Sequence, residues 1–161
     1  MAMNMRGVLS MTIEHILPVR VAYLRRTGPY GPGNNSTMEQ LKTWAKNERL
    51  LNHESVIFGI AQDNPKTTPP EDCRYDACLA VADSFCTRDD RISLGQLDGG
   101  CYAVFAVAHT ADAIQQAWRD IFAVLQQQGL SSNLTKPVIE RYAAQMVSRH
   151  ECEICVPLLM P

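Results

Sequence analysis

The order of extended and helical segments most constrains the fold of this chain, because one pattern occurs twice. Each half begins with a run rich in β-branched and aromatic residues, continues with apolar residues spaced three or four apart, and ends in two more β-rich runs. Such runs predict strands, and the wider spacing predicts a helix with one apolar face. The first half is predicted as a strand at 19–26, a helix at about 36–51 and strands at 55–61 and 75–81; the second as a strand at 101–109, a helix at 111–128 and strands at 138–143 and 152–158.

Turn-forming residues separate these segments. The sequence Thr27–Gly33 (TGPYGPG) ends the first strand, Asn35 or Ser36 offers an N-cap for the first helix, and Gly129 stops the second helix. This order predicts an α+β fold of duplicated βαββ units, with an antiparallel sheet and two helices. Sequence identity between the halves is low, so the repeat rests on the order and length of the elements. We expect a single domain over residues 1–161, with pseudo-repeats at about 14–83 and 95–159.

Charge and hydropathy exclude several classes of protein. The chain has a formal net charge of −2 and no block of Lys and Arg, so direct binding to nucleic acid is not expected. No apolar run approaches the roughly 18 residues that cross a bilayer, and residues 1–15 lack the apolar core of a signal peptide. We therefore expect no membrane association and a cytoplasmic location, where the six cysteines remain thiols.

An acidic residue near the end of the chain has distinctive neighbours. In Val138–Tyr142 (VIERY), strand alternation places Glu140 and Tyr142 on one face and Arg141 on the other. A carboxylate withdrawn from water is costly without a positive partner, so an acid beside an aromatic ring suits a cationic ligand. The alternative is a solvated carboxylate beside Arg141, and the spacing alone does not decide between the two.

The other reactive side chains form no recognisable catalytic or metal-binding pattern. Cys152 and Cys155 lie in an apolar strand, which would direct their sulfur atoms to opposite faces, so core packing is favoured over zinc or redox chemistry. The four histidines are scattered, and Gly99-Gly100 is typical of a hairpin or bulge rather than a phosphate loop. We predict no catalytic triad, no metal ion and no cofactor.

Several short stretches, in order along nearly the whole chain, are those of one known family. They are Thr27–Tyr30, Leu41 with Trp44, Gly59, Asp63–Pro65, Pro69–Glu71, Arg74–Asp76, Gly99-Gly100 with Tyr102, Trp118, Pro137–Tyr142 and Glu153–Pro157. In this order and spacing the chain resembles the gyrase-inhibitory-protein-like (GyrI-like) family, which includes the effector-binding domains of AraC-type and MerR-type multidrug-responsive regulators.

This resemblance implies a fold and a binding site. Two βαββ units would pack about a pseudo-twofold axis around a central ligand groove, and Glu140 would meet the positive charge of the ligand. Glu153 is the competing acid, because its alternation with Ile154 leaves the direction of this part of the strand open. Cys155 stands where many relatives have an aromatic residue. The residues expected to bind the ligand are Glu140, Trp44, Trp118, Tyr102, Tyr142, Phe58, Tyr23 and Cys155.

The function implied by the resemblance is binding or sensing of a cationic or amphipathic, drug-like small molecule. The chain leaves no room for a DNA-binding helix-turn-helix region beside this domain, so we expect a stand-alone binding domain. Some stand-alone relatives resemble hydrolases that open strained electrophilic rings, in which Glu140 would act as general acid or base. A third alternative is an inhibitory partner of DNA gyrase, so a regulator or topoisomerase is a further expected partner.

Overall fold

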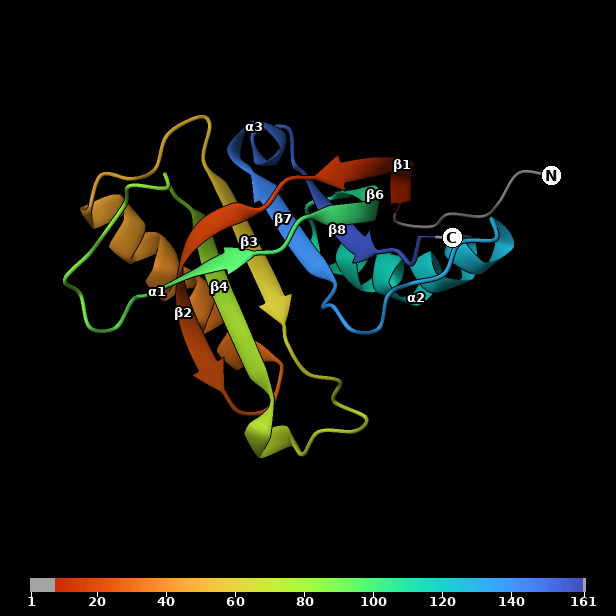
Figure 1. Ribbon diagram of the computed structural model, residues 1–161, viewed down its shortest axis with the longest axis horizontal. Coiled ribbons are helices and arrows are strands. Elements are labelled where there is room, and N and C mark those ends of the chain that lie inside the picture. Colours follow the sequence, from red (N-terminus) through yellow and green to blue (C-terminus); the bar gives the residue numbers. More distant parts are fainter. Residues whose placement is uncertain (1–7, 161) are drawn as a thin grey trace.

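The computed structural model describes residues 8–160, which form one eight-stranded sheet and three α-helices (Figure 1). The strands are β1 (Val8–Ile16), β2 (Val19–Thr27), β3 (Val56–Ala61), β4 (Arg74–Ala80), β5 (Ser93–Leu97), β6 (Gly100–Ala108), β7 (Ile139–Ala143) and β8 (Glu151–Pro157). The helices are α1 (Pro32–Asn47), α2 (Ala111–Gln127) and the single turn α3 (Ala144–Val147), and a 3₁₀ turn covers Pro70–Asp72. No helix within residues 8–160 is long and apolar enough to cross a membrane.

The strand order shows the predicted duplication. The sheet runs β1-β6-β8-β7-β3-β4-β2-β5, and every neighbouring pair is antiparallel. From the central β3–β7 pair outward, β4, β2 and β5 on one side correspond to β8, β6 and β1 on the other. Each half therefore contains the order strand, helix, strand, strand, as β2-α1-β3-β4 and as β6-α2-β7-β8. The predicted α+β fold is confirmed.

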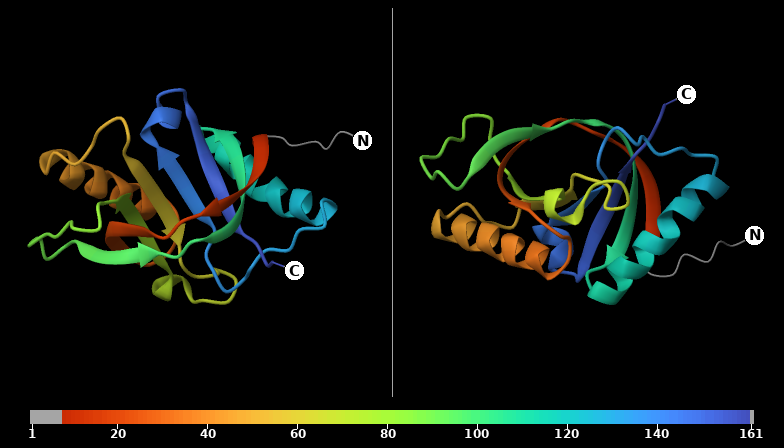
Figure 2. Two further views of the ribbon diagram at one scale, coloured as in Figure 1. Left: turned by 45° about the horizontal axis from the view of Figure 1, so that its top comes forward. Right: turned by 90° about the horizontal axis from the view of Figure 1, so that it is seen from below.

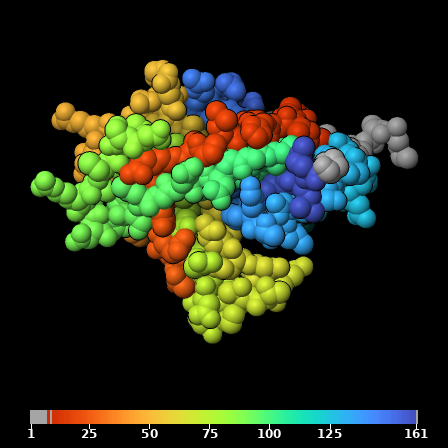
Figure 3. All heavy atoms as spheres, in the orientation of Figure 1, coloured from red at the N-terminus to blue at the C-terminus, as the bar shows by residue number. Residues whose placement is uncertain are grey.

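Strands β1 and β5, which the sequence patterns did not predict, join the two halves. β1 leads into β2, and β5 leads into β6, each through a two-residue break. Both pairs share one register, because Ile16 lies opposite Gly100 and Val19 lies opposite Leu97. The two segments thus form one long antiparallel ribbon, which crosses the front of the molecule as adjacent bands from one half to the other (Figure 3).

The ribbon curls the sheet, so that both of its faces are buried. Seen from below, α1 and α2 lie on one side, which we call the outer face, while the ribbon arches over the opposite, inner face (Figure 2). Outer-face side chains form one core under α1 and a second under α2. A third core fills the inner face and contains Val21, Phe58, Ile60, Cys78, Tyr102, Val104, Ile139 and Cys155.

Two ionic clusters border the inner core. Arg25 donates from Nε and Nη2 to the two carboxylate oxygens of buried Asp76, each at 2.8 Å. Arg141 donates from Nε to Glu153 Oε1 at 2.9 Å and from Nη2 to Glu14 Oε2 at 3.0 Å. Buried charges persist when they are paired and hydrogen-bonded, and both clusters meet that condition.

The first helix begins earlier than the cap residues suggested. It starts at Pro32 after Gly31, whose φ of 142° suits glycine, rather than after Asn35 or Ser36, and it ends at Asn47. A tyrosine anchors the preceding turn, because the hydroxyl of Tyr30 donates to the Arg74 carbonyl at 2.8 Å and accepts from the Asp63 N–H at 3.1 Å. Tertiary anchoring of the turn therefore fixes where α1 begins.

Candidate functional site

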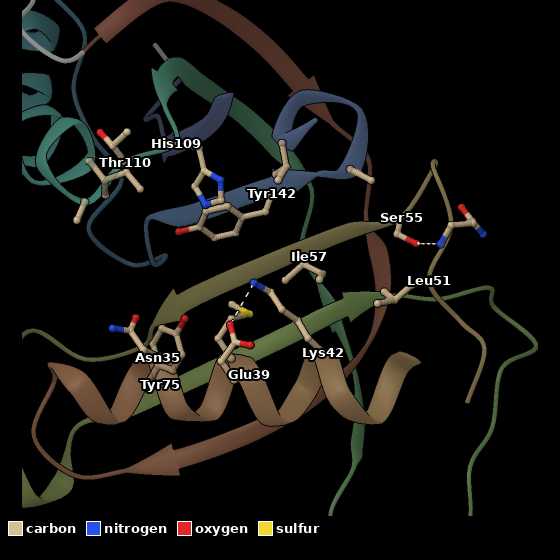
Figure 4. Close-up of a pocket in the computed structure, with 16 residues that line it drawn as sticks. Asn35, Glu39, Lys42, Leu51, Ser55, Ile57, Tyr75, His109, Thr110 and Tyr142 are labelled. Atoms are coloured by element: carbon tan, nitrogen blue, oxygen red, sulfur yellow. Dashed lines mark hydrogen bonds and ion pairs between the residues drawn. The ribbon is translucent and has the colours of Figure 1, made fainter. Parts of the chain in front are cut away.

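A groove of about 520 Å³ lies over the centre of the outer face, between the two halves (Figure 4). One wall is α1, and the other is formed by the end of β6, the start of α2 and α3. The central strands β3, β4 and β7 provide the floor through Ile57, Tyr75 and Tyr142. The volume is in the range of pockets that hold drug-sized molecules.

The pairing of β3 with β7 determines what lies beneath the groove. Tyr142 lies opposite Ile57, and Glu140 lies opposite Gly59. Gly59 leaves space for Tyr75, since a Cβ atom on this glycine would be 2.7 Å from the Tyr75 hydroxyl oxygen. Tyr142 lines the groove while its hydroxyl donates to Glu140 Oε2 at 2.9 Å. Glu140 therefore lies just below the aromatic floor, and not on the groove surface itself.

Burial raises the pKa of Glu140, while hydrogen bonds from Tyr142 and Trp118 act in the opposite direction. The same burial, together with the nearby Glu140 charge, raises the pKa of both Tyr75 and Tyr142. Among residues 8–160, no Lys, Arg or His forms an ion pair with Glu140. Glu140 thus differs from the buried acids of the inner face, which have arginine partners.

The groove walls carry charges of both signs. Lys42 and Glu39 project from α1 and form an ion pair with 3.5 Å between Nζ and Oε1. His109, at the end of β6, packs its ring against Tyr142 with 5.4 Å between ring centroids. Burial, and next the positive charge of Lys42, lower the pKa of His109. Lys42 and His109 therefore lie on opposite walls of the groove, one as an ammonium group and the other as an imidazole whose charged form is disfavoured.

The residues predicted to bind the ligand occupy three separate regions. Tyr142 lines the groove, and Glu140 and Trp118 lie together behind it. Trp44 is buried against Phe85, outside the groove, and its indole nitrogen has no hydrogen-bond partner within the described part of the chain. The remaining four lie on the inner face, across the sheet from the groove: Tyr23, Phe58, Tyr102 and Cys155.

The competing acid and the cysteine pair have structural roles. Glu153 belongs to the inner face, where Arg141 binds it, while its neighbour Ile154 packs in the core under α2. Cys152 and Cys155 also point to opposite faces, and burial raises the pKa of each thiol to about 12. Within residues 8–160, no group of three His, Cys, Asp or Glu residues is arranged to hold a metal ion.

Sequence reasoning missed three residues of the groove. Tyr75 lies within the family stretch Arg74–Asp76, but it was not among the residues predicted to bind the ligand. Lys42 and His109 face each other only because a helix of one half meets a strand end of the other half, and no spacing along the chain encodes that contact. The junction between a strand and a helix at His109 was the available signal, since such junctions often line sites.

Two named proteins show the relation of this sequence to known proteins. The chain is 40% identical over 151 residues to YosT, named as a candidate transcriptional regulator derived from the SPbeta prophage of Bacillus subtilis strain 168; the match covers 93% of this chain and 99% of YosT. It is 29% identical over 126 residues to a DNA gyrase inhibitor of Salmonella typhimurium, which covers 76% of this chain and 79% of the inhibitor.

Solved structures share the fold at low sequence identity. The C-terminal domain of EcmrR superposes with a TM-score of 0.69 at 17% identity, over 94% of this chain and 98% of that domain. SAV2435 bound to tetraphenylphosphonium superposes with a TM-score of 0.60 at 14% identity, over 94% of each chain. Residues 10–159 match the model of the GyrI-like small molecule binding domain, and the chain therefore belongs to the GyrI-like family of small-molecule-binding domains.

Proposed function

We propose that the groove between α1 and α2 binds an amphipathic, cationic compound, and that Glu140 provides the negative charge that recognises it. The main support for this proposal is that Glu140 is mostly buried and has no positively charged partner among residues 8–160. Glu140 accepts a hydrogen bond from Tyr142 and has Trp118 nearby, but it has no basic partner in the described chain. A ligand cation near this carboxylate would supply the missing charge.

The floor of the groove suits the same ligand. A flat or bulky apolar body would lie on the rings of Tyr75 and Tyr142, whose faces also attract a cation by about 0.5–2 kcal/mol each. Rotation of the Tyr142 side chain would let the cation approach Glu140 directly. Binding would strengthen as Glu140 ionises, so affinity would fall when the pH is lowered through its raised pKa.

Similar proteins support a sensing role. SAV2435 has the same fold and was solved with tetraphenylphosphonium, a lipophilic cation, and YosT is named as a candidate regulator. We therefore propose that the chain serves as an effector-binding module of the multidrug-responsive type, acting in the cytoplasm. The likeness to a DNA gyrase inhibitor also supports a topoisomerase partner, which a gyrase supercoiling assay with the wild-type protein tests directly.

The test compares two ligands of the same shape and opposite charge. Tetraphenylphosphonium and tetraphenylborate are titrated into wild-type protein while tryptophan fluorescence is recorded, because Trp118 lies beside Glu140. We expect saturable, micromolar binding of the cation only, weakened about tenfold or more in Glu140→Gln. Glu39→Gln, which removes an exposed acid of the same groove, is the matched control and should change affinity little. Equal affinity of wild type and Glu140→Gln for the cation would refute the proposal.

A hydrolase is the second candidate, favoured by the raised pKa of Glu140 beside the Tyr75 and Tyr142 hydroxyls. Glu140 would accept a proton from water as the water oxygen bonds to a ring carbon; the ring C–O bond would break, and its oxygen would take a proton from a tyrosine. Styrene oxide is the probe, and its diol product is measured by chromatography. Glu140-dependent diol formation supports this reading, whereas equal rates with and without protein exclude it.

A further inference from the structure

Two basic side chains from different halves meet above the aromatic floor of the groove. Lys42 comes from α1, and His109 directly follows β6 in the two-residue link to α2. Figure 4 shows the Lys42 side chain extending across the groove toward Tyr142 and His109. Because the His109 ring packs on Tyr142, its position is fixed by the floor and does not depend on a flexible stem.

The surroundings of His109 in the unliganded protein disfavour a charged imidazole. Burial is the main cause, and the positive charges of Lys42 and His150 act in the same direction, so the pKa of His109 is lowered. At neutral pH the site therefore presents one ammonium group and one neutral imidazole that can donate a hydrogen bond. A negatively charged group placed between them would be attracted by the ammonium group and would accept hydrogen bonds from both side chains.

Glu39, the acid that already pairs with Lys42, should bind it more weakly than a ligand anion would. Glu39 is 3.5 Å from Lys42, but 73% of its side chain and 44% of that of Lys42 are exposed. Exposed ion pairs of adjacent helix turns contribute little, because water and salt screen them. A ligand anion held between Lys42 and His109, with the apolar floor beneath it, would displace this pair.

We propose that the natural ligand of the groove is amphoteric: an aromatic or apolar body with a carboxylate that binds between Lys42 and His109, and a cation that faces Glu140. Binding of the ligand cation near Glu140 rests on the proposed function, whereas binding of the ligand carboxylate rests on Lys42 and His109 alone. The acid lies below the floor and the bases lie on the walls, so a ligand on the floor has Lys42 and His109 beside it, and its cation reaches Glu140 when the Tyr142 side chain rotates.

Two dyes of one shape separate the anion subsite from the cation subsite. The methyl ester of a rhodamine is a cation, and its free acid has the same cationic ring system plus a carboxylate. Titration is followed by dye fluorescence anisotropy with wild-type protein. We expect the free acid to bind about tenfold more tightly than the ester, the usual effect of one charge-assisted hydrogen-bond network.

Substitutions then test which residues cause the preference for the free acid over the ester. Lys42→Met should remove most of the preference for the free acid over the ester, and Lys42→Arg should retain it. His109→Gln should reduce the preference by a few-fold. Lys46→Met is the control, because this exposed lysine lies on the same helix but does not line the groove.

The outcomes distinguish the two proposals. If the free acid binds no more tightly than the ester, or if its preference survives Lys42→Met, the anion subsite is wrong even when the ester binds in a Glu140-dependent manner. If the ester binds independently of Glu140 while the Lys42-dependent preference is present, the cation site is wrong and the anion subsite stands.

Discussion

At the scale of single residues, Glu140 gives the unliganded protein a pH-dependent weakness. Burial raises its pKa above the ordinary value of 4.5, so the folded state holds the proton more tightly than the unfolded chain. The resulting stability is fully present below the unfolded pKa and is lost as the pH rises through the folded pKa. Above the unfolded pKa, the raised pKa of Glu140 therefore lowers the free energy of unfolding.

Replacing this carboxyl by an amide should remove that loss. We expect Glu140→Gln to raise the free energy of unfolding at pH 8 by about 1 kcal/mol, or Tm by roughly 2–4 °C. The difference from wild type should shrink as the pH falls through the raised pKa of Glu140, because the wild-type carboxyl then takes up a proton. Thermal unfolding by circular dichroism over this pH range measures it, with exposed Glu39→Gln as a control of no expected change. A Glu140→Gln protein that is less stable at pH 8 would show that the carboxylate is stabilising.

At the scale of elements, the β3–β7 pair positions the aromatic floor. Gly59 is buried opposite Glu140, and a Cβ atom at this position would be 2.7 Å from the Tyr75 hydroxyl oxygen. We expect Gly59→Ala to cost about 1–3 kcal/mol of stability and to weaken tetraphenylphosphonium binding, because the Tyr75 ring must move. Urea unfolding and fluorescence titration measure the two effects.

A second substitution tests this cause. Tyr75→Phe removes the oxygen atom that the new Cβ would meet, so Gly59→Ala should cost clearly less stability in a Tyr75→Phe background. The double-mutant cycle measures this coupling, which should be on the order of 1 kcal/mol. Strictly additive effects of the two changes would mean that Tyr75 is not the group that Gly59 accommodates.

The strength of the local sequence pattern in each element explains which strands and helices could be predicted from the sequence. The strands that correspond to β2–β4 and β6–β8 have strong β-rich runs, and both long helices have a clear apolar spacing. β5 (SLGQL) has a glycine at its centre and few apolar residues, and the residues it pairs with in β2 lie 70 to 78 residues earlier, so no local pattern reveals it. β1 alternates weakly from Met11 to Glu14, and this signal could have been used.

Strand alternation correctly predicted that two residues of the site share one face of the sheet, because successive side chains of a strand point to opposite faces. It placed Glu140 and Tyr142 on one face, and the hydrogen bond between them agrees with that geometry. It could not show which face carries the groove for Phe58 and Tyr102, because the curled sheet buries both faces. Alternation of apolar and polar residues shows which face of a strand is buried only when the other face is exposed. It cannot distinguish the two faces where both are packed in a core.

At the scale of the whole molecule, the ribbon made by β1–β2 and β5–β6 ties the halves into one cooperative unit. Its bend brings Gly99 against the opposite segment, where a Cβ atom would overlap the carbonyl oxygen of Ile16 and lie 2.9 Å from Pro18 N. These contacts are with backbone, which cannot move aside as a side chain can. Gly99→Ala should therefore lower stability by about 1–3 kcal/mol, although the residue lies in neither βαββ core.

The two tryptophans allow each half to be followed separately. Trp44 belongs to the helix of the first half and Trp118 to the helix of the second, and they are the only tryptophans in the sequence. In Trp118→Phe and Trp44→Phe variants, fluorescence reports one half at a time during urea unfolding. We expect Gly99→Ala to shift both midpoints by the same amount within each background, because a shared ribbon gives one two-state transition. Gln96→Ala, at an exposed position of β5, should shift neither. A shift confined to one reporter would mean that the halves unfold independently.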